Sequence, residues 1–132
     1  MEQHLRRNDA RGTLQVEELE PGHLYVRVHG HLTAGVASDF ALFAELTAQR
    51  AERVNIYLDA RSLRGFDPAV RQAWYEVVLR NRQRIDRIAV ATQGVFISLS
   101  ARAAAAALKL IGVQMDVVNS PAAFEEMVVR AA

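Results

Sequence analysis

The sequence predicts an α/β domain with a mixed, mostly parallel sheet of five strands and four helices, in the order β-β-α-β-α-β-α-β-α. Two observations support this fold class. Two segments with alternating apolar residues are separated by a Pro-Gly pair, which is typical of an antiparallel hairpin. After them, short Val- and Ile-rich segments alternate with helical patterns, and such an order implies right-handed crossovers and a parallel sheet.

The domain is expected to begin with that hairpin, after a charged and flexible segment at residues 1–12. Its strands are "TLQVEELE" (Thr13–Glu20) and "HLYVRVHGHL" (His23–Leu32), and the Pro-Gly pair between them supplies the turn. In the second strand apolar residues alternate with polar or aromatic ones, so one of its faces should be buried. No linker or repeat divides the rest of the chain, and we expect one domain over residues 13–132.

The first helix is expected to follow Thr33, which together with Ser38 is a candidate N-cap. Four apolar residues and one threonine, spaced mostly three or four residues apart, define its expected buried side: Val36, Phe40, Phe43, Leu46 and Thr47. The next strand, "RVNIYLDA" (Arg53–Ala60), ends in a charged turn. The second helix should then run from Pro68, which suits a first helical turn, to about Arg84.

Two more strand–helix units complete the predicted fold. The strand "RIAVAT" (Arg87–Thr92) leads into a charge-poor helix that stops at Gly112, a residue typical of helix ends. The strand "VQMDVV" (Val113–Val118) leads into a last helix, which Ser120 and Pro121 open.

Charge and cysteine content exclude several classes of protein. Sixteen basic and fifteen acidic residues nearly cancel among 132, so no general attraction to nucleic acid or anionic lipid is expected. The absence of cysteine removes disulfides, thiolate nucleophiles and cysteine-based metal sites, and suits a reducing compartment. The polar first residues and the lack of a long apolar run predict a cytoplasmic protein with neither signal peptide nor membrane span.

Two aspartates frame the charged turn and raise the question of catalysis. Asp59 ends a predicted strand and Asp67 precedes a predicted helix, so both are candidates for the ligand-binding edge of an α/β sheet. Structural roles are the favoured interpretation. Asp67 before Pro68 is typical of an N-cap, so Asp67→Ala should cost about 1 kcal/mol, and Asp59 suits the loop amides.

The other polar residues form no recognisable catalytic or metal pattern. His29 and His31 flank Gly30 on one strand, but zinc requires three or four ligands and no acidic cluster completes the set. The serines lack a nucleophile elbow, and the glycines form no phosphate-binding fingerprint. We therefore expect no catalytic residues, no metal and no cofactor.

Apolar and aromatic residues outside the predicted core form a second candidate surface. Trp74 lies on the apolar stripe of its helix, and Tyr75 is beside it. The helix at residues 95–111 carries only two charged residues. Such a helix is either deeply buried, or its outer face, with Phe96 and Leu99, contacts a partner or an apolar ligand.

The turn "LDARSLRGFDPAV" resembles that of the STAS family, the domain of anti-sigma-factor antagonists, and within it the SpoIIAA-like branch. The branch pattern D-x-R-x-x-x-G-F-x-P is matched in register by Asp59, Arg61, Gly65, Phe66 and Pro68. Upstream, "VHGHLTAGVASDF" is similar to the segment that opens the first helix of that branch. In the wider family, a partner kinase phosphorylates the serine after the second aspartate. Here Pro68, Ala69 and Val70 stand in place of Ser, Ser and Gly, so the phosphoacceptor is missing, and Ser62 is the nearest hydroxyl.

The resemblance implies a bacterial, non-enzymatic interaction module that is not switched by phosphorylation at the usual position. Its partner would be a regulatory protein, either an anti-sigma-factor-like kinase or a scaffold, and a homodimer is left open. The implied interaction surface comprises Asp59, Arg61, Ser62, Arg64, Gly65, Phe66, Asp67, Pro68 and Arg71. The alternative is a carrier of a small apolar or lipid-like ligand that uses Trp74, Tyr75, Phe96 and Leu99.

Overall fold

The computed structural model describes residues 4–8, 12–35, 38 and 52–131. Its centre is a six-stranded sheet in which the strands lie in the same order as in the chain. The strands are β1 (His4–Asn8), β2 (Gly12–Glu20), β3 (His23–Leu32), β4 (Val54–Phe66), β5 (Ile85–Thr92) and β6 (Met115–Val118). The pairs β1–β2 and β2–β3 are antiparallel, whereas β3–β4, β4–β5 and β5–β6 are parallel. The predicted mixed sheet with an N-terminal hairpin is thereby confirmed.

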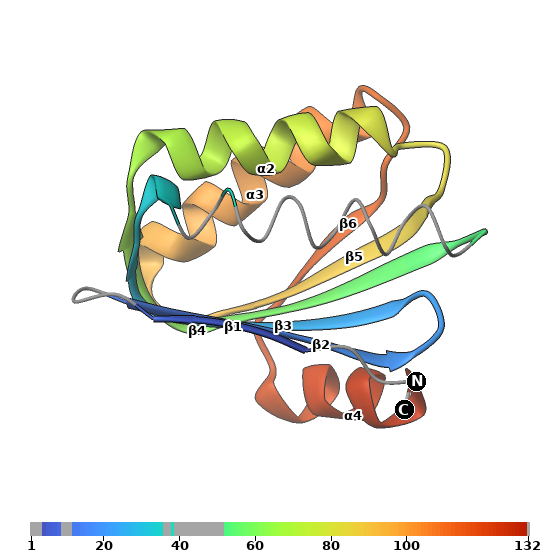
Figure 1. Cartoon of the computed structure of the whole chain (residues 1–132), viewed down its shortest axis with the longest axis horizontal. Coiled ribbons are helices and arrows are strands. Elements are labelled where there is room, and N and C mark those ends of the chain that lie inside the picture. Colours follow the sequence, from blue (N-terminus) through green and yellow to red (C-terminus); the bar gives the residue numbers. More distant parts are fainter. Residues whose placement is uncertain (1–3, 9–11, 36–37, 39–51, 132) are drawn as a thin grey trace.

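The described helices lie on both faces of this sheet (Figure 1). Helices α2 (Pro68–Arg80) and α3 (Val95–Lys109) cover one face, and α4 (Pro121–Ala131) covers the other. The larger core cluster lies between the sheet and α2 and α3, and a smaller cluster around Phe124 lies under α4. We call these two sides the α2/α3 face and the α4 face.

Strand β1 is an addition to the five predicted strands, because it forms in the segment expected to be flexible. It pairs with β2 from His4 opposite Glu17 to Asn8 opposite Thr13. The sequence "HLRRN" has a single apolar residue and no alternation, so its pattern carries no strand signal. Pairing with β2 along an edge of the sheet defines this strand.

Strand β4 is longer than predicted. The sequence analysis ended it at Ala60 and placed a turn before the second helix, but the strand continues to Phe66. Its last residues pair with the end of β3, where Leu32 lies opposite Phe66. The register shifts twice along this pair, and Gly30, at a φ of 77°, lies at one of the shifts. The polar residues after Ala60 therefore belong to an irregular parallel strand.

The helices end close to the predicted positions. Helix α2 stops at Arg80, four residues early, and Asn81 is its C-cap, where both the backbone N–H and the side-chain amide donate to the carbonyl of Val77. Helix α3 stops at Lys109, and Gly112 adopts a φ of 83° in the turn that follows. The predicted helix after Thr33 falls outside the described residues apart from Ala34, Gly35 and Ser38, which are helical. Among the helices in the described ranges, none has the length and hydrophobicity needed to cross a bilayer.

Candidate functional site

Asp59 lies in the middle of β4 on the α4 face, in a network of hydrogen bonds. The Arg61 guanidinium donates to both carboxylate oxygens, with Nε–Oδ1 and Nη2–Oδ2 distances of 2.9 Å each. The backbone N–H of Arg61 donates to Oδ1 at 3.1 Å, and the Tyr25 hydroxyl donates to Oδ2 at 3.3 Å. The residue is only 7% exposed, so these donors take the place of water around a buried carboxylate.

The pKa of Asp59 follows from the same contacts. Burial alone would raise the pKa of this carboxyl, but hydrogen bonds and charge from Arg61, with the Tyr25 hydroxyl, hold it below its ordinary value. The hydrogen bond to Asp59 likewise raises the pKa of Arg61. A carboxylate with a lowered pKa and four donors is a weak base, which argues against a role in proton abstraction.

Arg61 also joins the network to helix α4. Its Nη1 lies 3.4 Å from Oε1 of Glu125, and its guanidinium carbon lies 5.8 Å from the centre of the Phe124 ring. The Phe124 ring also packs against the Tyr25 ring, with centroids 6.4 Å apart. The Asp-x-Arg motif of the sequence analysis thus joins α4 to the sheet.

Asp67 lies in a different environment, at the start of α2. It occupies the predicted N-cap position, with φ −67° and ψ 146°, and its carbonyl accepts from the N–H of Val70 at 2.9 Å. The sequence analysis expected the Asp67 side chain to cap the helix, but this side chain makes no cap hydrogen bond. Instead Oδ1 lies 2.8 Å from Nε2 of His31 on β3. The two aspartates belong to separate networks, so the structure does not bring them together as a catalytic pair.

The two strand histidines also have different environments. His29 is exposed, whereas His31 is half-buried and paired with Asp67. A Cβ added to Gly65 would lie 3.1 Å from Nδ1 of His31, so the absence of a side chain at this position makes room for the imidazole. Within the described ranges, no three His, Cys, Asp or Glu residues come close enough together to hold a metal ion.

The position at which the sequence analysis expects no phosphoacceptor lies in the first turn of α2. Pro68 and Ala69 are exposed there, and neither carries a hydroxyl. Ser62 is also exposed, but it lies within β4, where it pairs with His29 of β3. Its hydroxyl is therefore on a strand rather than at a helix start.

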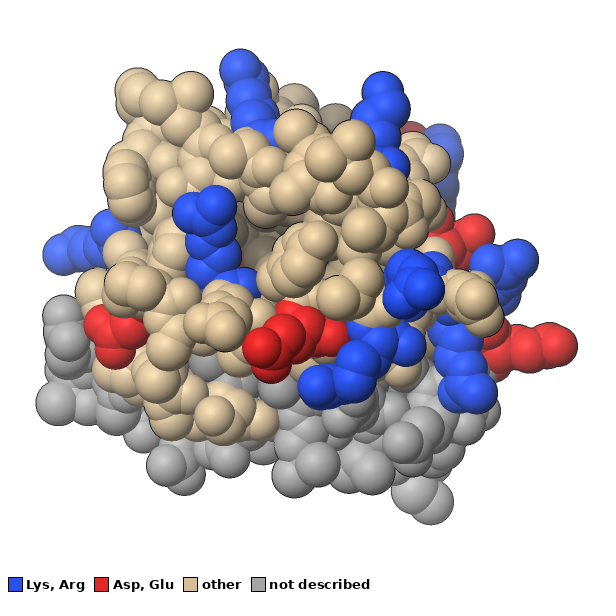
Figure 2. All heavy atoms as spheres, turned by 90° about the horizontal axis from the view of Figure 1, so that it is seen from above, with Lys and Arg blue, Asp and Glu red and all other residues tan. Residues whose placement is uncertain are grey.

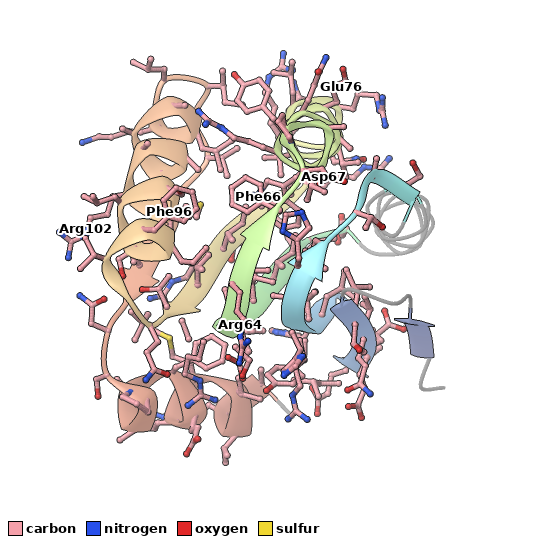
Figure 3. The ribbon with its side chains drawn as sticks, turned by 90° about the vertical axis from the view of Figure 1, so that its left-hand side faces the viewer. Arg64, Phe66, Asp67, Glu76, Phe96 and Arg102 are labelled. Atoms are coloured by element: carbon pink, nitrogen blue, oxygen red, sulfur yellow. The ribbon has the colours of Figure 1, made fainter. Side chains whose placement is uncertain are left out.

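The two candidate surfaces of the sequence analysis meet at a pair of aromatic rings. Phe66, at the end of β4, and Phe96, in the first turn of α3, have ring centroids 6.5 Å apart at an interplanar angle of 34°. Figure 3 shows the two side chains directed toward one another between α2 and α3. Around Phe96, which is 64% exposed, Val95 and Leu99 are 76% and 60% exposed. Large apolar side chains therefore cover the surface beside the start of α2.

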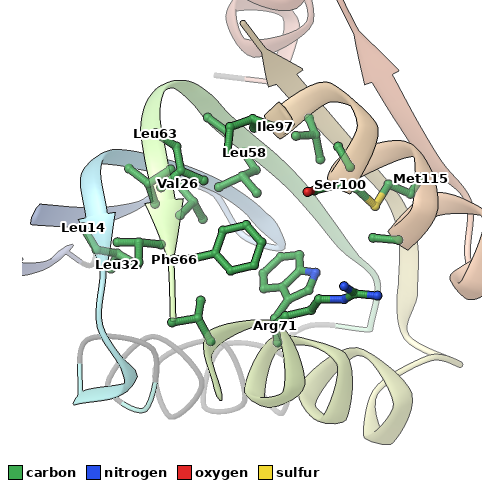
Figure 4. Close-up of a pocket in the computed structure, with 17 residues that line it drawn as sticks. Leu14, Val26, Leu32, Leu58, Leu63, Phe66, Arg71, Ile97, Ser100 and Met115 are labelled. Atoms are coloured by element: carbon green, nitrogen blue, oxygen red, sulfur yellow. The ribbon is translucent and has the colours of Figure 1, made fainter. Parts of the chain in front are cut away.

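Trp74 belongs to a cavity rather than to that exposed surface. The cavity has a volume of about 140 Å³ and lies between the sheet and helices α2 and α3 (Figure 4). Among the described residues that line it, nearly all are apolar, and the polar side-chain groups belong to Arg71, Ser100 and the indole of Trp74. Seen from above, the α2/α3 face has a hollow near its middle, and its Lys and Arg side chains lie mainly around the edge (Figure 2). The sequence analysis proposed an apolar ligand but did not locate this space.

The remaining predicted residues lie around these features. Arg64 and Arg71 are exposed, and Tyr75 is 36% exposed on α2. Nine residues were predicted to form one interaction surface, but Asp59 and Arg61 face α4. The others lie along the last part of β4 and the start of α2: Ser62, Arg64, Gly65, Phe66, Asp67, Pro68 and Arg71.

This arrangement, a mixed sheet with a strand-to-helix corner after the fourth strand, defines a STAS-type α/β module. The SpoIIAA-like family model matches residues 23–125. The chain therefore belongs to the SpoIIAA-like family. No curated protein matches the sequence.

Two solved structures share the fold over nearly their whole length. One is an uncharacterized protein from Shewanella loihica PV-4 with a SpoIIAA-like fold, at a TM-score of 0.63 and 12% identity, with 96% of this chain and 92% of that chain covered. The other is the anti-sigma factor antagonist SpoIIAA in its unphosphorylated form. Its TM-score is 0.56 at 12% identity, and the match covers 90% of this chain and 99% of that chain.

Proposed function

We propose that this chain is a non-enzymatic interaction module that binds a regulatory protein beside the start of α2. The observation that carries the proposal is the contact between Phe66 and Phe96, because it joins the helix start to the exposed apolar turn of α3. We define the docking surface by five residues: Phe66 at the end of β4, Pro68 at the start of α2, and Val95, Phe96 and Leu99 at the start of α3. The fold of SpoIIAA, an anti-sigma factor antagonist, supports a regulatory partner.

The chemistry of the docking surface indicates the kind of partner. Its centre is apolar, and exposed large apolar groups gathered in one place are typical of protein interfaces. Figure 3 shows Arg102 on the same helix as Phe96, whereas Arg64 lies farther down, toward α4. A partner with an apolar centre and an acidic residue opposite Arg102 fits this arrangement.

The proposed binding is independent of phosphorylation at the usual place. Phosphate adds nearly two negative charges, which disrupt a matched interface beside a helix start. Pro68 and Ala69 offer no hydroxyl for this modification. We expect the partner to stay bound in the presence of ATP and a kinase.

A comparison of three proteins tests the docking surface by quantitative capture from an extract of the native host. The test variant is Phe96→Ser with Leu99→Ser, and the control is Val129→Ser, at a residue on α4 that is 72% exposed. Recovery of the partner should fall at least about tenfold for the double variant, because two apolar contacts are lost. The control should match the wild type.

Equal recovery by all three proteins would contradict the proposed surface. A second arm adds ATP and maps phosphate on the chain. Stoichiometric phosphate on Ser62, together with loss of the partner in Ser62→Asp, would show that a phosphorylation switch exists at another position.

The cavity supports a second candidate function, the binding of a small apolar molecule. Apolar cavities of similar size remain dry and accept a benzene molecule. Helices α2 and α3 line the space together with the sheet, so an occupant would contact three elements at once. Native mass spectrometry of protein purified from cells tests this candidate. A copurifying small molecule supports a carrier, whereas a bare monomer or homodimer mass supports the docking module alone.

A further inference from the structure

The lining of the cavity contains an unusual combination of groups. Arg71 is the one charged side chain among the described residues on its walls, and the rest are apolar apart from Ser100 and the indole of Trp74. Figure 4 shows Arg71 extending from α2 along the cavity, with Ser100 on α3 on another wall. The space is therefore apolar inside and carries a cation at one side.

No acidic side chain neutralises this cation within the part of the chain that the structure describes. The ion pairs that form between described residues include those of His31, Arg61, Arg87 and Arg130, and none of them involves Arg71. Arg71 is exposed, so water solvates its guanidinium when the cavity is empty. Its planar fork remains available for a bidentate contact with a carboxylate.

The volume limits the size of any occupant. A cavity of about 140 Å³ holds a group near the size of a benzene ring, roughly six carbon atoms. Pockets for larger organic ligands have volumes of about 300 Å³ or more. A long acyl chain therefore does not fit within the walls as they stand.

We propose that the cavity binds a small organic carboxylate, with an aromatic or branched body of about six carbons inside and its carboxylate on Arg71. This inference rests on the second candidate function and specifies its ligand class. Burial of the body releases water from apolar surface, and the guanidinium favours an anion over a neutral or cationic analogue.

Three probes of one shape test the charge preference: benzoate, benzyl alcohol and benzylamine. Their dissociation constants are measured by titration, with methyl resonances of Val26, Leu58 and Ile97 as reporters of the cavity. We expect benzoate to bind about fivefold more tightly than benzyl alcohol, and benzylamine more weakly than either. The preference for benzoate should shrink at high salt, which screens an exposed ion pair.

Two variants with the same loss of charge separate Arg71 from general electrostatics. Arg71→Gln should remove the preference for benzoate while benzyl alcohol still binds. Lys109→Gln changes an exposed residue of α3 that does not line the cavity, and should keep the preference. A third variant, Ala104→Leu, places a larger side chain in the wall and should weaken all three probes.

The outcomes distinguish this inference from the candidate on which it rests. If no probe shifts the cavity resonances of the wild type, ligand binding in the cavity is wrong. If benzoate and benzyl alcohol bind equally to the wild type and to Arg71→Gln, the cavity binds apolar molecules and the carboxylate proposal alone is wrong. A preference for benzoate that survives in Arg71→Gln would also overturn the role of Arg71.

Discussion

The two faces of the sheet are closed in different ways. On the α4 face, Phe124 is completely buried, and Asp59 and Arg61 join the strand to the helix through charged hydrogen bonds. On the α2/α3 face, the larger apolar core leaves a cavity of about 140 Å³ and exposes Phe96 at its edge. The α4 face is tightly packed and held by charged hydrogen bonds, whereas the α2/α3 face contains a cavity and exposes apolar side chains.

This difference shows where architecture and function separate in the chain. The motif residues Asp59 and Arg61 resemble a functional pair in the sequence, yet their contacts are internal to the α4 face. The docking surface and the cavity both lie on the side that residues of α2 and α3 form. Substitutions on the α4 face should therefore change mainly stability, and those on the α2/α3 face mainly binding.

The largest expected effect comes from one substitution made on each face. Phe124→Ala removes a ring that is 0% exposed and should lower the free energy of unfolding by about 4 kcal/mol. Phe96→Ala changes a ring that is 64% exposed and should lower it by less than about 1 kcal/mol. Urea unfolding of the two variants measures both values. Similar losses would show that the α2/α3 face is as tightly packed as the α4 face.

A smaller effect is expected when the charged network loses its anion. Asp59→Asn leaves the Arg61 guanidinium without its carboxylate and should cost about 2 kcal/mol. This value is at the low end for such pairs because Arg61 remains 24% exposed and water can reach it. Asp86→Asn, at an exposed aspartate of β5, is the matched control and should cost less than about 0.5 kcal/mol.

The loss of stability in Asp59→Asn should depend on pH. The pKa of Asp59 in the folded protein is lower than its ordinary value of 3.8, so the carboxylate stabilises the fold at any pH above that value. The stabilisation is lost as the pH falls through the lower pKa of the folded state. The difference in unfolding free energy between wild type and Asp59→Asn should therefore be constant near neutral pH and decline below about pH 3.8. A difference that grows on acidification would contradict the network.

The smallest effect is expected at Asp67. Its side chain pairs with His31 rather than capping α2, and the two side chains are 37% and 28% exposed. Asp67→Ala should therefore cost between about 0 and 1 kcal/mol, as for other exposed ion pairs. A double-mutant cycle with His31→Ala identifies the cause. Coupling between the two substitutions supports the ion pair, whereas an undiminished cost in the His31→Ala background would point to the helix cap.

Regular patterns in the sequence predicted the fold well. The strand His23–Leu32 forms with the expected bounds, because its alternation reflects burial on one face. The extension of β4 to Phe66 escaped prediction, since its polar residues are held by pairing with β3, a contact distant in the sequence. Strand β1 escaped for the same reason: it is defined by its neighbour β2.

The candidate site was predicted less completely, and the reason is geometric. Asp59 and Arg61 were grouped with residues around Asp67 because they are close in sequence. A strand assignment would have placed Asp59 and Arg61 on one face, but the register shifts opposite β3 break the alternation before Phe66, so Leu63 and Phe66 share the other face. The pairing of His31 with Asp67 spans 36 residues, and the cavity depends on how side chains from several elements pack. No local pattern carries either feature.

The cavity between the sheet and helices α2 and α3 also affects how the protein responds to pressure. A void that water does not fill adds to the volume of the folded molecule and disappears when the chain unfolds. Hydrostatic pressure therefore shifts the equilibrium of this fold toward the denatured state, by an amount that scales with the part of the space of about 140 Å³ that water leaves unfilled. Any molecule that fills the space removes that volume difference, so compression distinguishes an occupied module from an empty one.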